Sequence, residues 1–514
     1  MSPQLSSVPN RLARWLWFVA LASLATRMWV AVALPMTGDE ALFYWWARFL
    51  DYGYYDHPPM VGWWIAASRA LLGDATWAVR ITAVLLPLGV GGAIWWAWAP
   101  VNRERAAWAV LLFWLMPVNW LASLVTTDTP LIFWAAWSAA AMVRAEQRTD
   151  RAGDQGQSAW GLYVLSGLFM ALAFLSKYFA VLLGLGYALY FVAFQLRRWR
   201  GFVWMILAAL PGVAVNLIWN AHHCWTNIMF NLFNRNEDAV FSLDKPLTYL
   251  AMMAYLLSPI GVWLLWRHRR EMWGVMKSQR LLACMAWVPL LCFGLMSGKK
   301  MIGLHWVLGF YPFLFVILAW TLPLNRFSVA AKGLGAFLAL HLLVAGVAGN
   351  LHLEQLQRFK FYHRLVEAAR ATDIVRQAQA DGTVLMATAY SSASIYGYAA
   401  GQHVPVFGMG SVHARQDDLI VDYGKLNGRN LRIILDRSPN PGEFEPYFDQ
   451  TRAWPIHESG VDFYVIEGTG FRYSVYRDRV MQEINRRYYH FPAWLPVSGC
   501  AFCQHFCGQN RCEP

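Results

Sequence analysis

Residues 15–46 read WLWFVALASLATRMWVAVALPMTGDEALFYWW and contain the two features that decide the fold. The run from 15 to 35 is apolar over a length that crosses the hydrocarbon core of a bilayer. The acidic pair Asp39-Glu40 follows where that run ends. Carboxylates are costly to hold near hydrocarbon, so a pair at the mouth of a membrane span is more often a site of chemistry than of packing. A helix cap or a solvated loop pair is the structural alternative.

The composition extends this interpretation to the whole chain. Of 514 residues, 57% are hydrophobic and only 14% are charged, with a mean hydropathy of +0.32, which indicates an integral membrane protein. The 29 Trp residues agree, because indoles favour the two interfaces of a bilayer. The first apolar run continues past Trp29 without a small-residue cleavage site, so we expect a retained first span.

The formal net charge of +12 does not indicate nucleic-acid binding. Acidic and basic residues balance from Leu351 onward, so the excess lies in the apolar part of the chain. There the basic residues cluster in every second gap, a positive-inside pattern that places the N-terminus in the cytoplasm. The clusters are Arg11 and Arg14; Arg103 and Arg105; Arg144, Arg148 and Arg151; Arg197, Arg198 and Arg200; Arg267, Arg269, Arg270, Lys277 and Arg280; and Arg326 and Lys332.

About eleven segments are predicted to cross the membrane as helices. They lie near 15–35, 76–98, 107–125, 130–146, 160–176, 178–195, 202–219, 247–266, 281–297, 303–323 and 329–349. An odd number of crossings from a cytoplasmic start leaves the C-terminus outside, and an error of two would not change that side. Among the outer segments, residues 36–75 form a long loop with two aromatic stretches, 40–50 and 59–72, expected as interfacial helices.

The chain after residue 350 has a different composition, with charges, turns and β-branched runs. Strands are predicted at 383–387, 431–435 and 463–466, between helical stretches at 353–380 and 474–487. The predicted architecture is therefore a polytopic α-helical membrane domain over residues 1–350, followed by an outer α/β domain over residues 351–514.

Further polar residues accompany the acidic pair on the outer side. Tyr55 and His57 close the first loop and offer donors and stacking faces suited to a phosphate or a sugar, although an interfacial aromatic turn explains them equally well. Asp128 lies between two close spans, and capping of the next helix is its alternative role. Lys177 lies in a gap too short for a free loop, where it suits an anionic headgroup or snorkels to the interface.

More cations lie near the same side. Lys299 and Lys300, with His305 close by, form a cationic group, and Arg27 lies inside the first span near its outer end. Acids and bases balance on the outer face of the membrane part, so it is no basic patch. Paired opposite charges suit a site that handles both a phosphate and a hydroxyl.

The order of these motifs resembles that of a known family. Gly38-Asp39-Glu40, then Tyr54-Tyr55-Asp56-His57-Pro58-Pro59, Thr127-Asp128-Thr129-Pro130-Leu131 and Leu175-Ser176-Lys177-Tyr178 resemble polyprenyl-phosphate-dependent glycosyltransferases of the membrane C-type (GT-C) fold. The bacterial relatives of protein O-mannosyltransferases and aminoarabinose lipid A transferases are most similar. The resemblance covers residues 10–350 and implies an enzyme of the bacterial inner membrane with a periplasmic C-terminal domain.

The resemblance also implies an inverting transfer from a polyprenyl-phosphate sugar, such as an undecaprenyl-phosphate sugar, to a periplasmic acceptor. Asp39 matches the first-loop catalytic aspartate and is expected to act as the base, and Glu40, its neighbour, is expected to support it as a second catalytic residue. His57 stands where some relatives have a lysine that contacts the donor phosphate, and a mostly neutral His weakens that contact. Asp128 and Lys177 match positions near the site, with Lys177 the better phosphate ligand. Donor contacts are also expected from Tyr55, Lys299, Lys300 and Arg27.

Neither the sugar nor the acceptor follows from the sequence. Lipid A, another envelope glycan or lipid, and a protein hydroxyl all fit as acceptors; no metal ligands are assigned, and help from a divalent metal is left open. The competing hypothesis is a transporter or flippase of a lipid-linked sugar. It predicts internal repeats and charges at mid-membrane, and the sequence shows no repeat and no acid in the middle of a predicted span.

The cysteines add one more question. Cys500, Cys503, Cys507 and Cys512 crowd the tail, where disulfides, a zinc site or free thiols are possible, with disulfides favoured outside the cytoplasm. Cys224, Cys284 and Cys292 suggest no pairing. We expect the tail to stabilise the outer domain by crosslinking it rather than to take part in sugar transfer.

Overall fold

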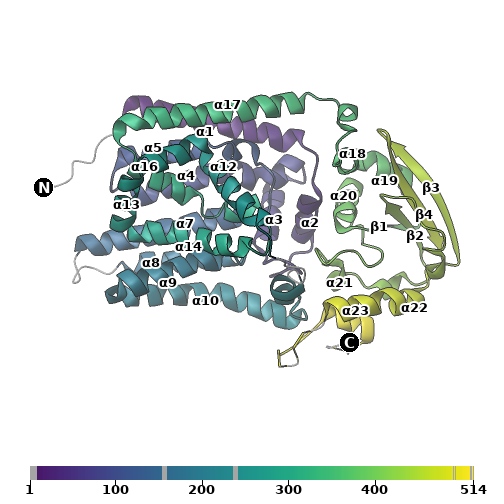
Figure 1. The fold of residues 1–514 in the computed structure, drawn as a ribbon. Coiled ribbons are helices and arrows are strands. Elements are labelled where there is room, and N and C mark those ends of the chain that lie inside the picture. The colour runs from purple at the N-terminus through teal and green to yellow at the C-terminus, as the bar shows by residue number, and fades with distance from the viewer. Residues whose placement is uncertain are drawn as a thin grey trace. The chain divides into compact units, whose positions relative to one another are not determined.

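The computed structural model describes residues 8–152, 159–234, 241–489, 491–492, 494–509 and 512. It divides into two compact units, which are considered separately (Figure 1). The first comprises residues 1–33, 68–214 and 239–349, and the second comprises 34–67, 215–238 and 350–514. The second unit thus combines the chain after residue 350 with residues 34–67 and 215–238 of the predicted membrane part. Residues 235–238 of the latter segment lie outside the described residues.

The first unit consists of helices. They are α1 (Asn10–Ala33), α4 (Thr76–Trp98), α5 (Arg103–Trp114), α6 (Val118–Leu121), α7 (Asp128–Ala152), α8 (Trp160–Phe174), α9 (Ala180–Phe194), η1 (Leu196–Arg198), α10 (Trp199–His222), α12 (Asp244–Arg267), α13 (Arg269–Ser278), α14 (Arg280–Ser297), α15 (Leu304–Val307), α16 (Pro312–Thr321), η3 (Leu324–Arg326) and α17 (Phe327–Gly349). The last turns of α10 belong to the second unit. Helices therefore occupy all eleven segments that the sequence predicts as spans.

Six helical stretches are long and apolar enough to cross a membrane among the described residues. They are Asn10–Ala33, Thr76–Trp98, Leu196–His222, Asp244–Arg267, Arg280–Ser297 and Leu324–Gly349. Trp160–Phe174, Ala180–Phe194 and Pro312–Thr321 are apolar but shorter. The structure is thus mostly helical and rich in apolar helices, while the number of crossings stays a prediction.

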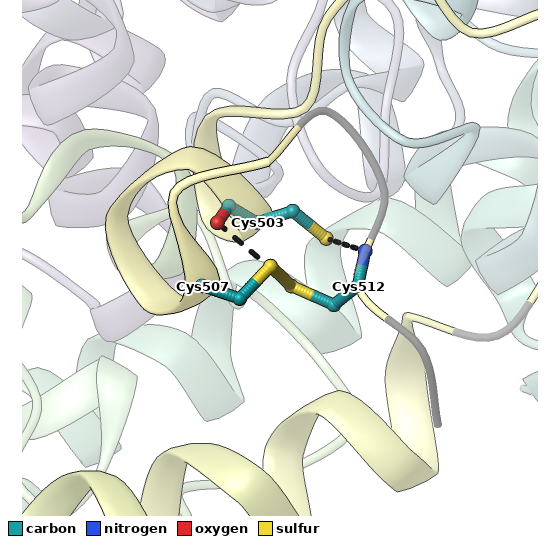
Figure 2. Close-up of side chains that lie close together, drawn as sticks. All are labelled: Cys503, Cys507 and Cys512. Atoms are coloured by element: carbon teal, nitrogen blue, oxygen red, sulfur yellow. Dashed lines mark hydrogen bonds between the residues drawn. A yellow bond between two sulfur atoms is a disulfide. The ribbon is translucent and has the colours of Figure 1, made fainter.

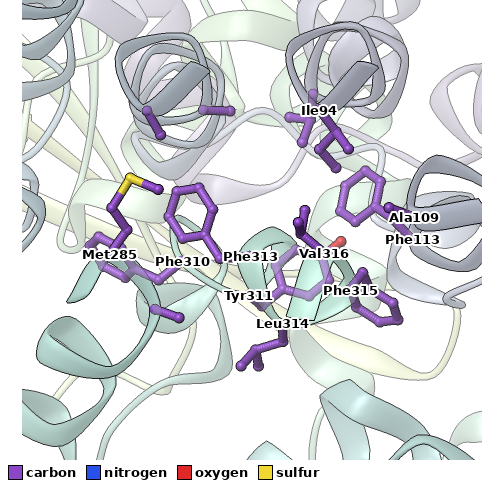
Figure 3. Packing of buried hydrophobic residues seen from close by; sticks show 14 of the residues in the cluster. Ile94, Ala109, Phe113, Met285, Phe310, Tyr311, Phe313, Leu314, Phe315 and Val316 are labelled. Carbon is purple, nitrogen blue, oxygen red and sulfur yellow. The ribbon is translucent and has the colours of Figure 1, made fainter. Parts of the chain in front are cut away.

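A dense apolar core fills the first unit. Helix α16 is buried on all sides, which is expected where apolar residues surround a helix completely (Figure 3). Phe313, Phe315 and Val316 pack with Ile94 of α4 and Phe113 of α5 in the same cluster (Figure 3). The short central helix is therefore held by close packing with its neighbours.

The predicted span 107–125 is wrong in its extent, because the helix ends at Trp114. Pro117 explains the break, since the residue before a proline avoids the α-helical region. The Asn119 side chain donates to the Phe113 carbonyl over 2.6 Å and accepts from the Tyr311 hydroxyl over 2.7 Å. Ser23 donates to the Asn119 carbonyl. The non-helical segment thus has side-chain partners for its polar groups.

The second unit contains a four-stranded mixed sheet. Its elements are α2 (Gly38–Arg48), α3 (Met60–Leu72), which continues into the first unit, α11 (Thr226–Met229), η2 (Phe230–Asn234), η4 (Leu353–Leu356), α18 (Tyr362–Ala369), α19 (Ala371–Ala378), β1 (Thr383–Ala387), α20 (Tyr390–Ala400), α21 (Asp417–Ile420), η5 (Tyr423–Leu426), β2 (Asn430–Leu435), η6 (Glu445–Tyr447), β3 (Gln450–Glu458), β4 (Val461–Thr469), α22 (Tyr473–Tyr476), η7 (Arg477–Met481), α23 (Gln482–Tyr488) and α24 (Ala501–Cys507). The strand order is β1-β2-β4-β3, with β1 and β2 parallel and the other pairs antiparallel.

The predicted α/β character of this region is correct, but strand β3 was not predicted. Its sequence, QTRAWPIHE, contains charged residues and Pro455. These residues are tolerated because β3 lies at the edge of the sheet. The predicted helical stretch 353–380 is divided among η4, α18 and α19. Helices were correctly predicted near 40–50 and 59–72, where α2 and α3 lie.

Two disulfides involve the cysteine-rich tail. Cys224, for which the sequence suggests no pairing, pairs with Cys500, and Cys507 pairs with Cys512. Cys503 takes part in neither bond, and its sulfur accepts from the Cys512 amide (Figure 2). The Cys224–Cys500 bond joins residues 276 positions apart, both in the second unit, a distance in sequence at which pairing has no local signature.

Replacing Cys224 by Ser should destabilise the second unit, because the Cys224–Cys500 bond restricts its unfolded chain. Loss of a native disulfide typically costs about 2–5 kcal/mol. Thermal unfolding of the detergent-purified protein measures the effect, with Cys292→Ser as the control at a cysteine outside both disulfides. An unchanged melting temperature, or peptide mapping without a 224–500 link, would contradict this pairing.

Candidate functional site

Helix α2 begins with a complete capping box. The Thr37 hydroxyl accepts from the Glu40 amide over 3.5 Å, and the Glu40 carboxylate accepts from the Thr37 amide over 3.3 Å and from its hydroxyl over 2.9 Å. Glu40 is only 1% exposed. The structure therefore gives Glu40 the capping role that the sequence offered as an alternative for the pair.

Asp39 has a different environment from that of Glu40. It lies in the first turn of the same helix, where the N-terminal dipole favours a negative charge, and it is exposed. The Tyr390 hydroxyl, at the start of α20, donates to its carboxylate over 3.1 Å. Burial and the Asp39 carboxylate raise the pKa of Tyr390, so the phenol stays a hydrogen-bond donor at neutral pH. Asp39 is therefore the accessible carboxylate of the acidic pair.

Close packing against α20 fixes the position of α2. A Cβ atom on Gly38 would lie 2.5 Å from the Cβ of Ser391, so only glycine allows this approach. The Trp45 indole donates to the Ser394 carbonyl over 3.3 Å, and Tyr44 meets Tyr398 edge to face at 4.9 Å between ring centroids. Tyr390 and Ser391 were missed by sequence reasoning, because they lie in the C-terminal region without a recognisable motif.

The end of the first loop is ordered by aromatic packing. Tyr54 stacks on Trp46 with ring centroids 4.4 Å apart, and the half-buried His57 ring lies 6.4 Å from the Trp46 ring. Tyr55 is fully buried, and its amide donates to Gln416 over 2.8 Å. Burial raises the pKa of Tyr55. The structure thus places Tyr55 in a core, whereas part of His57 remains accessible.

Asp128 and Lys177 are brought together in the first unit. The Lys177 ammonium donates to both carboxylate oxygens of Asp128, over 2.9 and 2.7 Å, and both side chains are buried. The Lys177 nitrogen also lies 5.2 Å from the centre of the Phe179 ring. Asp128 is the first residue of α7, where the Thr126 hydroxyl accepts from the Asp128 amide and the Thr129 hydroxyl accepts from the Thr126 amide. The main partner of the Asp128 carboxylate is thus a cation.

Arg27 has an evident structural function. Its guanidinium donates to four backbone carbonyls of the first unit, including that of Ala83 over 2.5 Å and that of Ala122 over 2.6 Å. Pro87 lies four residues after Ala83 in α4 and has no N–H to bond that carbonyl. Arg27 is 2% exposed. Arg27 therefore supplies hydrogen-bond donors to carbonyls that lack a helical N–H partner, because of Pro87 in α4 and because of the helix break after α5.

The cations after α14 lie near the surface. Lys299 is exposed, and its carbonyl accepts from the Lys245 ammonium over 2.9 Å. The Lys300 nitrogen lies 5.9 Å from the centre of the Trp306 ring, beside His305. The exposed Lys299 is therefore accessible to an anion.

The cysteine tail contains the one group of potential metal ligands found among the described residues. The sulfur atoms of Cys503, Cys507 and Cys512 lie within 4.8 Å of one another (Figure 2). Two of these sulfurs are joined in a disulfide, which does not bind a metal as a thiolate does. Within the described part of the chain, Asp39 and Glu40 belong to no such group.

Known proteins match both the sequence and the fold. Residues 56–219 match the family described as dolichyl-phosphate-mannose-protein mannosyltransferase. Lipid A galacturonosyltransferase RgtD of Rhizobium johnstonii (strain DSM 114642 / LMG 32736 / 3841) is 28% identical over 234 residues, 42% of this chain and 48% of that protein. The chain thus spans about half the length of this curated relative.

The fold is similar to that of ArnT from Cupriavidus metallidurans. The apo structure of ArnT has a TM-score of 0.64 at 14% identity, over 89% of this chain and 98% of that one. The structure of ArnT bound to undecaprenyl phosphate has a TM-score of 0.63 at 14% identity, over 88% and 98%. The resemblance inferred from the sequence is therefore confirmed: this chain has the fold of the GT-C membrane glycosyltransferases and contains a region that matches one of their families.

Proposed function

We propose that the protein is an inverting glycosyltransferase of the bacterial inner membrane that uses a polyprenyl-phosphate sugar as donor. The observation that carries this proposal is the position of Asp39, an exposed carboxylate on a capped and closely packed helix. The donor class is supported by the similarity in fold to ArnT, whose structure was solved with undecaprenyl phosphate bound. The proposed acceptor is a lipid of the cell envelope such as lipid A, the acceptor class in the name of RgtD.

In the proposed reaction, Asp39 accepts the proton of an acceptor hydroxyl. The hydroxyl oxygen bonds to the anomeric carbon of the sugar from the face opposite the phosphate, while the bond from that carbon to the phosphate oxygen breaks. The products are the glycosylated acceptor and polyprenyl phosphate, which leaves with the bonding electrons. Direct displacement from the opposite face inverts the configuration at that carbon.

The cations of the first unit have a separate part in the proposal. A phosphate leaving group gains negative charge as its bond to the sugar breaks, and a nearby cation stabilises that charge. Lys177 is the main cation proposed, with Asp128 holding its ammonium in place through the two hydrogen bonds. Lys299, Lys300 and His57 are proposed as further contacts of the donor. Arg27 and Tyr55 are left out, because carbonyl bonding and burial account for them.

Asp39→Asn should lower kcat by about 100-fold or more, the effect of losing a general base, with little change in melting temperature. The assay incubates purified protein with a panel of undecaprenyl-phosphate sugars and lipid A, and detects the glycosylated lipid by mass spectrometry. The matched control is Glu40→Gln, because Gln also completes a capping box. It should remain near wild type, whereas full activity of Asp39→Asn would exclude Asp39 as the base.

Breaking the Asp128–Lys177 pair tests its role in the donor site. Asp128→Asn or Lys177→Met alone should destabilise the protein by about 3–5 kcal/mol, because each leaves a buried charge without its partner. The double variant should recover most of the melting temperature but keep a raised KM for the donor or a low kcat. Wild-type kinetics in a stable double variant would show that the pair is only structural.

The contact of Gly38 with Ser391 can be tested by a compensating pair. Gly38→Ala should lower kcat and destabilise the protein by about 1–3 kcal/mol, since the added methyl overlaps the Ser391 side chain. Ser391→Gly removes that side chain and should restore part of both quantities in the double variant. Equal activity of Gly38→Ala and wild type would mean that this close approach does not position Asp39.

A further inference from the structure

The gap between α12 and α14 contains a short amphipathic helix, α13. Its polar residues are strongly basic, and the predicted topology assigns this gap to the cytoplasmic side. The bases are Arg267, Arg269, Arg270, Lys277 and Arg280, against the acid Glu271. Glu271 lies 3.7 Å from His268. A basic cluster next to a membrane span favours anionic lipids.

The other face of α13 is apolar and only partly covered. Met272 and Met276 are half-buried, whereas Trp273 is 57% exposed and Trp266, at the end of α12, is 64% exposed. Indole rings so exposed beside a basic helix are typical of the zone between lipid headgroups and acyl chains. Helix α13 therefore has the composition of a helix that lies in the membrane surface.

An apolar groove lies beside this helix. It has a volume of about 520 Å³ and is lined by residues of α9, α13 and α14, including Leu189, Met276, Trp287 and Leu291. Arg280 is the one charged residue among those that line it. The Arg280 guanidinium lies 4.7 Å from the centre of the Phe194 ring, a contact that holds the charge at the groove.

Two other grooves of the first unit differ in charge. The groove of about 660 Å³ between α12 and α17, which includes Tyr255 and Phe337, has no charged residue in its lining. The groove of about 530 Å³ beside α1, α5 and α17 has Arg11 and Lys332, but also the acid Glu104. The α9/α13/α14 groove is thus the one of these three that combines an apolar lining with an unopposed basic residue.

We propose that this groove binds an anionic glycerophospholipid of the cytoplasmic leaflet. One acyl chain would lie along the α9 and α14 side chains, and the headgroup phosphate would contact Arg280, with Lys277 adding to the positive potential. The site is separate from the proposed sugar transfer and does not depend on it. A zwitterionic lipid would fill the groove without the same preference, because its headgroup carries no net charge for the basic cluster to attract.

The test measures lipid retention by native mass spectrometry of the full-length protein. The protein is incubated with phosphatidylglycerol or with phosphatidylcholine of the same acyl chains. Wild type should retain phosphatidylglycerol preferentially, and Arg280→Gln should lower that preference by about fivefold, the weight of one basic residue at an anionic surface. Ala283→Phe, which fills the groove, should reduce retention of both lipids.

Arg200→Gln is the matched control. Arg200 lies in another basic gap of the same predicted side and also contacts an indole, that of Trp199 at 5.7 Å, but it does not line this groove. This variant should keep the wild-type preference. The proposal is wrong if Arg280→Gln and Arg200→Gln behave alike, if wild type shows no preference, or if undecaprenyl phosphate displaces phosphatidylglycerol from the site.

Discussion

The close approach of α2 to α20 is the constraint on which the candidate site depends. Gly38 removes the one side chain that would keep the helices apart, and the Trp45 indole and Tyr44 ring then contact α20. The capping box holds the first turn, so Glu40 points into the protein and Asp39 remains exposed beside Tyr390. This combination of a fixed backbone and an open carboxylate suits the base proposed here.

Three basic residues differ in function according to their partners. Arg27 donates hydrogen bonds to backbone carbonyls. These bonds stabilise the proline-containing helix α4 and the segment where the helix after α5 is broken. Lys177 bonds a carboxylate, so the two charges neutralise one another while remaining a polar group in an apolar surrounding. Arg280 is exposed at an apolar groove and has an aromatic ring beneath it. An arginine thus supports the fold at position 27, whereas the arginine at position 280 suits the proposed lipid headgroup.

Much of the fold follows from the length and position of apolar runs in the sequence. Long apolar runs predicted the helices correctly, because length and hydrophobicity leave few alternatives in a membrane protein. The exceptions have local causes: Pro117 ends one helix early, and β3 resembles a loop in sequence because an edge strand needs no alternating apolar face. The Cys224–Cys500 bond was not predictable, since sequence spacing carries no information about a contact across 276 positions.

The sequence by itself determined the membrane class, the order of the helices and the family resemblance, including Asp39, Asp128 and Lys177. These properties depend on composition, on the length of apolar runs and on the order of short motifs. Only the tertiary structure decided which of two chemically similar residues is buried in a structural role and which has a different partner or stays exposed. Glu40 caps a helix while Asp39 stays open, and Arg27 bonds carbonyls while Lys177 meets Asp128. The physical reason is that burial and hydrogen-bond partners come from segments far apart in the chain, which no local pattern records.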